Sequence, residues 1–196
     1  MVELVVSDIL SKSSDERAYV MLLREREGVR KILVAIGYLE AQAIAFAMKN
    51  ITTKRPVTHD LFGTIFDVLG AKMHSVVVNK VEDGTFYSNL LFKVGDSEEL
   101  REVDARTSDA VAIALRCAAP IYIKEELLNR VCIRDEFNGA ISIPISIADT
   151  KTLQAVMRQA VEEENYELAS KLKEELDSRK RESDQNRESD EHLNIE

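Results

Sequence analysis

Two short polar runs, at residues 55–61 and 104–110, each lead into an apolar stretch with helical spacing. Each run places a hydroxyl group, a carboxylate and a nearby arginine where the chain turns into a helix. In the first run Thr58 is suited to cap the helix, and His59 and Asp60 follow it. If the two helix starts meet in space, they gather carboxylates, guanidinium groups and one imidazole. These are side chains that handle phosphates or metal ions.

The rest of the first 130 residues predicts a sheet covered by helices. Apolar and β-branched runs between turn signals indicate strands, and apolar residues at helical spacing indicate helices. Asp83-Gly84 between two such runs is a strong hairpin signal. The predicted strands are 2–10, 18–23, 30–36, 72–81, 85–94, 100–104 and 121–123, and the predicted helices are 38–49, 60–69, 108–118 and 124–130. The expected fold class is α+β, with a mostly antiparallel sheet packed with helices.

The composition changes near residue 152 and predicts a second region. Apolar residues at helical spacing over 153–161 and 166–176 predict a small C-terminal helical hairpin at 152–180. Residues 1–135 form the expected main domain, and 136–151 are a linker or an edge strand. Residues 181–196 are polar and charged, and are expected to be a disordered tail. So short a hairpin buries little area, so we expect it to need a partner surface, on the main domain or on another protein.

The charge balance limits how this chain can bind nucleic acid. Its net charge is −9, whereas a protein that coats nucleic acid without specificity is usually basic. Any such contact is expected at a local patch, and the candidates are Lys54, Arg55, Arg106 and Arg116.

The sequence favours a cytoplasmic protein. It contains no apolar run of about 18 residues and no basic segment followed by an apolar leader, so neither a membrane span nor a signal peptide is expected. Cys117 and Cys132 lie in apolar runs without a CxxC pattern or a histidine cluster, and are expected to be reduced, buried thiols.

The polar residues contain each group that phosphodiester hydrolysis requires. Mg²⁺ or Mn²⁺ held by one or two carboxylates neutralises phosphate charge and positions a water molecule. Arginine binds phosphate in a bidentate manner, and histidine accepts protons near neutral pH. A second interpretation remains open: Asp60 and Asp109 complement helix dipoles, and Thr58 and Ser108 cap helices.

Several runs, in order, resemble the bifunctional nuclease domain family over residues 1–135. They are Ile36-Gly37 with Glu40 and Ala43, then 55–61, 83–87, 104–110 and Ala119-Pro120-Ile121. The resemblance implies an α+β domain, often oligomeric, with a proposed nuclease activity on DNA and RNA. The family's typical polar positions are, in this sequence, Glu40, His59, Asp60, Arg106, Ser108 and Asp109.

Residues 152–180 resemble the UVR motif of the excision-repair proteins UvrB and UvrC. The run 165–174 is similar to the second helix of that motif. It departs from the motif at Ser170, where a second alanine is usual, and at Lys173-Glu174, where an Arg-Asp pair is usual. The resemblance implies a protein–protein contact through the hairpin.

Together these observations predict a metal-assisted nuclease with an interaction hairpin, as a homo-oligomer without a membrane span. The predicted catalytic residues are His59, Asp60, Asp109 and Glu40; the predicted substrate-binding residues are Arg55, Arg106, Ser108 and Arg116; and the predicted Mg²⁺ or Mn²⁺ ligands are Asp60, Asp104 and Asp109. The alternative is a non-enzymatic oligomeric adaptor that acts through the hairpin, and the acidic net charge favours it somewhat.

Overall fold

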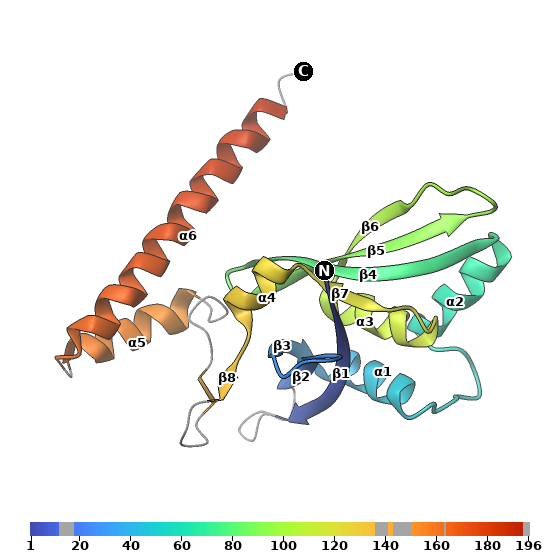
Figure 1. Ribbon diagram of the computed structural model, residues 1–196, viewed down its shortest axis with the longest axis horizontal. Coiled ribbons are helices and arrows are strands. Elements are labelled where there is room, and N and C mark those ends of the chain that lie inside the picture. Colours follow the sequence, from blue (N-terminus) through green and yellow to red (C-terminus); the bar gives the residue numbers. More distant parts are fainter. Residues whose placement is uncertain (12–17, 136–140, 143–149, 163, 194–196) are drawn as a thin grey trace. The chain divides into compact units, whose positions relative to one another are not determined.

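A computed structural model describes residues 1–11, 18–135, 141–142, 150–162 and 164–193 (Figure 1). The chain divides into two compact units. The first comprises residues 1–80 and 86–142, and the second comprises residues 81–85 and 143–196. Among the described residues, no helix combines the length and apolar character that crossing a bilayer requires.

Among the described residues, the main sheet has seven strands in the order β3-β2-β1-β7-β4-β5-β6. The strands are β1 (Val2–Ser11), β2 (Ala18–Glu25), β3 (Lys31–Gly37), β4 (Ala71–Glu82), β5 (Thr85–Val94), β6 (Arg101–Arg106) and β7 (Ile121–Ile123). The first three form an antiparallel meander. Strand β7 lies between β1 and β4, antiparallel to β1 and parallel to β4. The predicted α+β class and mostly antiparallel sheet are confirmed.

Helix α3 (Thr107–Arg116) is the most buried helix of the first unit, and it contacts both α1 (Tyr38–Met48) and α2 (Thr58–Val68). Ala110, Ala112 and Ala114 have no exposed surface. Small side chains let neighbouring elements approach the α3 backbone closely. The short helix α4 (Glu125–Val131) follows β7, and its Leu128 is fully buried.

Apolar side chains of the predicted elements form the core. Among the largest fully buried side chains are Leu4, Met21, Leu23, Ile32, Ile44, Val76, Val78, Ile113, Ile123 and Leu128. Both cysteines are free, as predicted, and Cys132 is buried whereas Cys117 is only half-buried.

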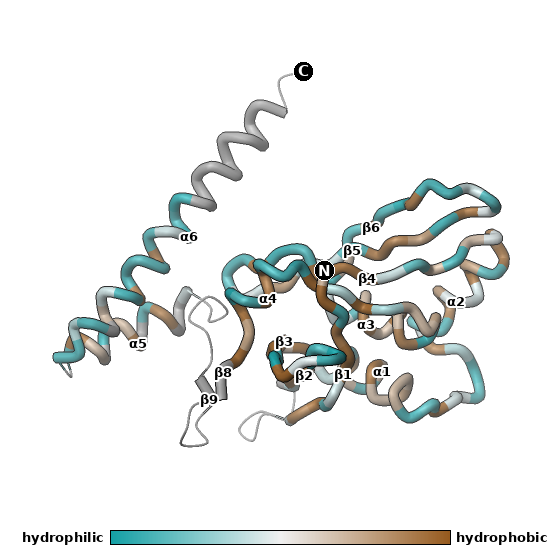
Figure 2. Tube along the Cα trace, in the orientation of Figure 1, coloured by the Kyte–Doolittle hydropathy of each residue, from teal (hydrophilic) through white to brown (hydrophobic). Residues whose placement is uncertain are grey.

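The second unit contains the predicted helical hairpin, formed by α5 (Thr150–Glu162) and α6 (Tyr166–Leu193). Leu153, Ala160 and Leu172 are buried between the helices, as their spacing predicts. Helix α6 continues to Leu193, whereas the sequence predicted disorder from residue 181. Arg, Glu and Gln, which have high helix propensity, make up six of the 13 residues 181–193, so helix can continue without a packed face. Figure 2 shows the described part of α6 as mostly hydrophilic.

The turn between β4 and β5 belongs to the second unit, where Asp83 caps α5. Asp83 and Gly84 have φ of 45° and 75°, as a two-residue hairpin turn requires. The Asp83 carboxylate accepts hydrogen bonds from the Thr150 backbone N–H at 2.8 Å and from the Thr150 hydroxyl at 2.5 Å. Arg179 of α6 donates a third, at 3.2 Å. The pKa of Asp83 is lowered, mainly by the hydrogen bond from the Thr150 hydroxyl.

The structure refines two predicted boundaries, the start of α2 and the region 136–151. Helix α2 begins at Thr58, so Val57 occupies the N-cap position that was predicted for Thr58. The Asp60 carboxylate instead accepts the Val57 N–H at 3.0 Å, which satisfies one of the groups that a helix start exposes. In the predicted linker or edge strand at 136–151, Ile141–Ser142 (β9) pairs with Arg134–Asp135 (β8). Residues 136–140 and 143–149 lie outside the described residues.

We expect Ala112→Leu to destabilise the protein, because Ala112 is fully buried in the helix that contacts α1 and α2. Overpacking of this kind costs about 1–3 kcal/mol of unfolding free energy. Urea unfolding monitored by circular dichroism measures the change. The control is Ala35→Leu at an exposed position of β3, which should change stability by less than about 0.5 kcal/mol. Equal stability of the two variants would contradict close packing around α3.

Candidate active site

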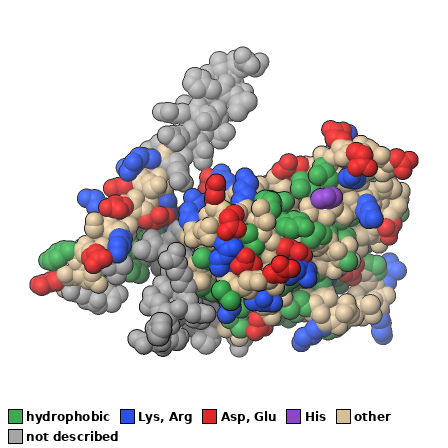
Figure 3. Space-filling view, in the orientation of Figure 1, with side chains coloured by type: hydrophobic (Ala, Val, Ile, Leu, Met, Phe, Trp, Pro, Cys, Tyr) green, Lys and Arg blue, Asp and Glu red, His purple; other side chains and the backbone are tan. Residues whose placement is uncertain are grey.

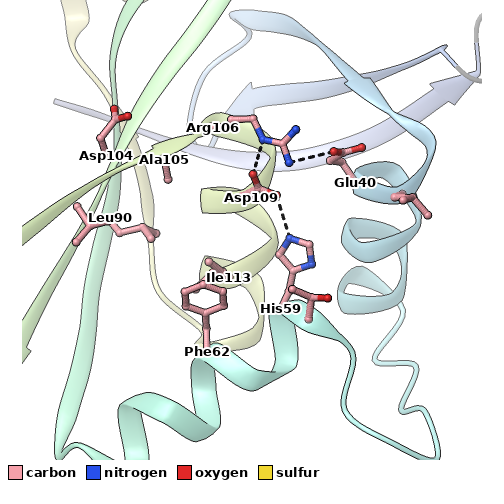
Figure 4. Close-up of a pocket in the computed structure, with 12 residues that line it drawn as sticks. Glu40, His59, Phe62, Leu90, Asp104, Ala105, Arg106, Asp109 and Ile113 are labelled. Atoms are coloured by element: carbon pink, nitrogen blue, oxygen red, sulfur yellow. Dashed lines mark hydrogen bonds and ion pairs between the residues drawn. The ribbon is translucent and has the colours of Figure 1, made fainter.

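The two helix starts singled out in the sequence do meet. His59, in the first turn of α2, lies with its Nε2 atom 3.1 Å from Oδ1 of Asp109, in the first turn of α3 (Figure 4). The His59 side chain is largely buried, and Asp109 is about a quarter exposed. An imidazole and a carboxylate that come from positions 50 residues apart are therefore in direct contact.

Arg106 joins this pair to a third helix start. It precedes α3, and its Nε donates to Oδ2 of Asp109 at 2.6 Å. A terminal nitrogen of the same guanidinium lies 3.1 Å from Oε1 of Glu40, in the first turn of α1. The Arg106 side chain is 69% exposed, whereas that of Glu40 is 19% exposed. The sequence-predicted residues Glu40, His59, Arg106 and Asp109 thus form one connected chain of polar contacts.

These contacts keep Asp109 ionised. Burial acts to raise the pKa of Asp109, but the hydrogen bonds from Arg106 and His59 outweigh it, and the pKa lies below its ordinary value. The Asp109 contact likewise raises the pKa of Arg106. At neutral pH the site therefore holds a carboxylate and a guanidinium, with the imidazole of His59 beside the carboxylate.

A pocket of about 540 Å³ adjoins the polar chain. Its polar lining includes Glu40, Thr58, His59, Asp104, Arg106 and Asp109, and its apolar lining comprises Leu39, Phe62, Leu90, Val103, Ala105 and Ile113. Sequence reasoning did not identify this apolar wall, because Phe62 and Ile113 have the spacing of core residues. The sequence signal for this wall was Leu39, which directly precedes the predicted site residue Glu40. In the structure Leu39 is 71% exposed.

Asp60 and Arg116 form a separate contact with a structural role. Arg116 Nε donates to Oδ1 of Asp60 at 2.5 Å. Its other nitrogens donate to the backbone carbonyls of Ala112, at 2.8 Å, and of Ala43, at 3.1 Å. The Arg116 side chain is 12% exposed, and it lines a different pocket from His59. This geometry holds α2, α3 and α1 together, and the catalytic role of Asp60 and the substrate-binding role of Arg116 stay predictions.

The predicted metal set does not come together. Asp109 contacts Arg106 and His59, whereas Asp60 contacts Arg116 and lines a different pocket. Figure 4 shows the Asp104 carboxylate directed away from the polar chain. In the part of the chain that the structure describes, no three carboxylate, imidazole or thiol side chains form a group that could hold a metal ion. The donor set therefore does not fit a metal ion held by protein ligands alone.

The remaining two predicted substrate-binding residues lie outside the pocket lining. Ser108 is buried in the first turn of α3, with 8% of its surface exposed. Arg55 is exposed in the loop before α2. Arg106 is therefore the one predicted substrate-binding residue that lines the pocket.

Comparison with known proteins matches two regions of the chain. Residues 21–136, which contain every member of the polar chain, match the bifunctional nuclease domain, and residues 150–180 match the UvrB/uvrC motif. An uncharacterized protein of Mycobacterium tuberculosis is 41% identical over 109 residues, which cover 56% of this chain and 63% of that protein. Bifunctional nuclease 1 of Arabidopsis thaliana is 30% identical over 167 residues, covering 74% of this chain and 51% of that protein. The matches thus span between half and two thirds of these relatives.

We expect Asp60→Asn to lower stability near neutral pH by about 1–3 kcal/mol, because the nearly buried Arg116 loses its charged partner. The Arg116 hydrogen bond is the main cause that lowers the Asp60 pKa from 3.8. Because the pKa of Asp60 is lower in the folded state than in the unfolded state, its charge stabilises the fold. This stabilisation is fully present above the pKa of the unfolded state, and it is lost as the pH falls through the lower pKa of the folded state. The gap between wild type and variant should therefore close in acid.

Urea unfolding as a function of pH tests this expectation. Asp67→Asn, an exposed acid on the same helix, is the matched control and should change stability little at any pH. A stability gap for Asp60→Asn that is the same at neutral and acid pH would show that the Asp60 charge is not its origin.

Proposed function

Because the chain belongs to the bifunctional nuclease domain family, we propose that it hydrolyses phosphodiester bonds of DNA, RNA or both at the pocket lined by His59, Arg106 and Asp109. The observation that carries the proposal is the His59–Asp109 contact at 3.1 Å beside an exposed arginine. This arrangement combines a proton acceptor, a group that orients it and a group that binds phosphate.

In this proposal His59 is the general base. The carboxylate of Asp109 can only accept, so the proton of the neutral imidazole sits on Nε2 and Nδ1 becomes the acceptor. Nδ1 takes a proton from the attacking water as its oxygen bonds to phosphorus; the bond between phosphorus and the ester oxygen breaks, and the leaving oxygen takes a proton from solvent. Asp109 then stabilises the imidazolium that results. Asp109 acts through His59 and is therefore a positioning residue.

Arg106 supplies the phosphate contact. Its guanidinium is always charged and its planar donors match phosphate oxygens. Two nitrogens already contact Asp109 and Glu40, which fixes the plane of the group at the pocket. On the face shown in Figure 3, Lys and Arg side chains of the described residues are interspersed with Asp and Glu. On a surface of mixed charge, phosphate binding by one arginine at the pocket is more consistent than binding by a broad basic face.

A requirement for Mg²⁺ or Mn²⁺ stays a prediction, and the roles of His59, Asp109 and Arg106 given above do not depend on it. Glu40 and Asp109 are the carboxylates that line the pocket nearest His59, and both contact Arg106. We therefore assign no step to Mg²⁺ or Mn²⁺. Cleavage assays with either ion or with EDTA decide whether one is required.

We expect His59→Asn to lower the cleavage rate by about 10²–10⁴-fold, the usual contribution of a general base. Asp109→Asn should lower kcat by at least about tenfold, because His59 loses the group that orients it. The assay uses highly purified protein with labelled single- and double-stranded DNA and RNA. His74→Asn, which changes an exposed histidine outside the pocket, is the matched control and should retain activity.

Each outcome of this assay distinguishes cleavage at the proposed site from cleavage by another source or from the adaptor function. Cleavage that is equal in wild type and His59→Asn would indicate a contaminant or another site. No cleavage on any substrate would favour the adaptor function. That function has its own support in the UvrB/uvrC match and in the exposed Val161 and Tyr166 of the hairpin, which a partner protein could cover.

The pocket further predicts a preference for single strands. Phe62 lines it beside Leu90 and Val103, and an unstacked base can stack on an aromatic ring with about 1–3 kcal/mol. Phe62→Ala should therefore raise KM for single-stranded substrates by about fivefold or more, with a smaller change in kcat. Val29→Ala, an exposed apolar change in the β2–β3 turn, is the control. Equal cleavage of duplex and single strands, unchanged in Phe62→Ala, would contradict this preference.

A further inference from the structure

Helix α2 turns an apolar stripe away from the body of its own unit. Leu61, Ile65, Val68 and Leu69 are 45%, 47%, 79% and 64% exposed. Their positions are i, i+4, i+7 and i+8, the spacing with which a helix normally faces a core. Large apolar side chains exposed singly are common, but a complete stripe of them marks an interaction surface.

The opposite side of α2 makes the contacts within the unit, and many of those contacts are polar. His59 and Asp60 face α3 through Asp109 and Arg116. Phe66 packs on Phe92 of β5, with ring centroids 5.6 Å apart. Within α2, all of whose residues the structure describes, no side chain is fully buried. The helix therefore buries little of its apolar surface within one copy of the chain.

The stripe continues onto the neighbouring connection between β5 and β6. The Gly95 N–H donates to the carbonyl of Gly70 at 2.8 Å, which ties the residue after Val94 to the residue after Leu69. Val94 is 43% exposed. From their exposed fractions, the five side chains present roughly 500 Å² of apolar surface, a large part of the ~800 Å² that each partner buries in a standard interface.

We propose that this surface, formed by Leu61, Ile65, Val68, Leu69 and Val94, is the interface between two copies of the chain. Its apolar area approaches what a stable dimer needs, and none of these five side chains is charged. Homodimer interfaces are more apolar than transient ones. A two-fold axis places one α2 stripe against the other, so that each apolar position meets an apolar position. Dimer formation covers the stripe and gives α2 the apolar contacts it lacks in one copy.

The proposal does not depend on nuclease activity, and sedimentation tests it directly. Wild-type full-length protein at micromolar concentrations should sediment at twice the 22.1 kDa mass of the chain. The double variant Ile65→Asp, Val68→Asp should raise the dimer dissociation constant at least about hundredfold, because it buries four like charges in the interface. Val68→Lys, at a position 79% exposed in one copy, provides a milder variant whose folding is not at risk. Circular dichroism confirms that each variant is folded.

Two control variants separate this surface from others. Val29→Asp alters an exposed apolar residue of the β2–β3 turn, and Val161→Asp alters one at the end of α5. Both should leave the dimer intact if α2 forms the interface. A wild type that sediments as a monomer would overturn the proposal. So would a dimer that survives both α2 variants, or one that only Val161→Asp dissociates, since the hairpin would then be the contact.

Discussion

The contact between Asp60 and Arg116 is the constraint on which the arrangement of the helices depends. Arg116 ends α3, and Asp60 in the first turn of α2 accepts from it while also accepting the Val57 N–H. His59, one residue earlier, reaches Asp109 near the other end of α3. Asp109 and Arg116 are seven residues apart, so two adjacent side chains of α2 span about 10 Å of α3. With so little apolar burial within one copy, α2 keeps its place mainly through these polar contacts, and the candidate site keeps its geometry with it.

Much of this architecture could be predicted from the sequence, because local signals and the global fold agree. The β1–β3 meander, the Asp83-Gly84 turn, the alanine-rich α3 and the helical hairpin all follow from period, turn chemistry and spacing. The sequence predicted a meeting of the two helix starts only as a condition, and the specific pairs His59–Asp109 and Arg106–Glu40 come from the structure. Each pair lies more than 45 positions apart, so sequence spacing could not establish the contacts.

What the sequence could not supply is the direction of each side chain. Asp60 follows His59 directly, but successive helical residues point about 100° apart, which sends one carboxylate toward Arg116 and one imidazole toward Asp109. The same rotation decides that Leu61 and Ile65 face outward, although their spacing predicts a buried helix face. Asp60, Asp104 and Asp109 do not form a group among the described residues. Helix α6 extends beyond residue 180, where the charged composition predicts disorder.

The cap that Asp83 provides for α5 has a consequence for the order of folding. The two residues that form it are separated by 67 positions, so the contact closes a long loop and is entropically expensive to form early. The β4–β5 turn, in contrast, closes over two residues and can form first. The first turn of α5 then finds its acceptor already presented at the turn, as the chain emerges from N- to C-terminus during synthesis. On this view the helical hairpin is a late-folding element whose nucleation is guided by a turn made long before it.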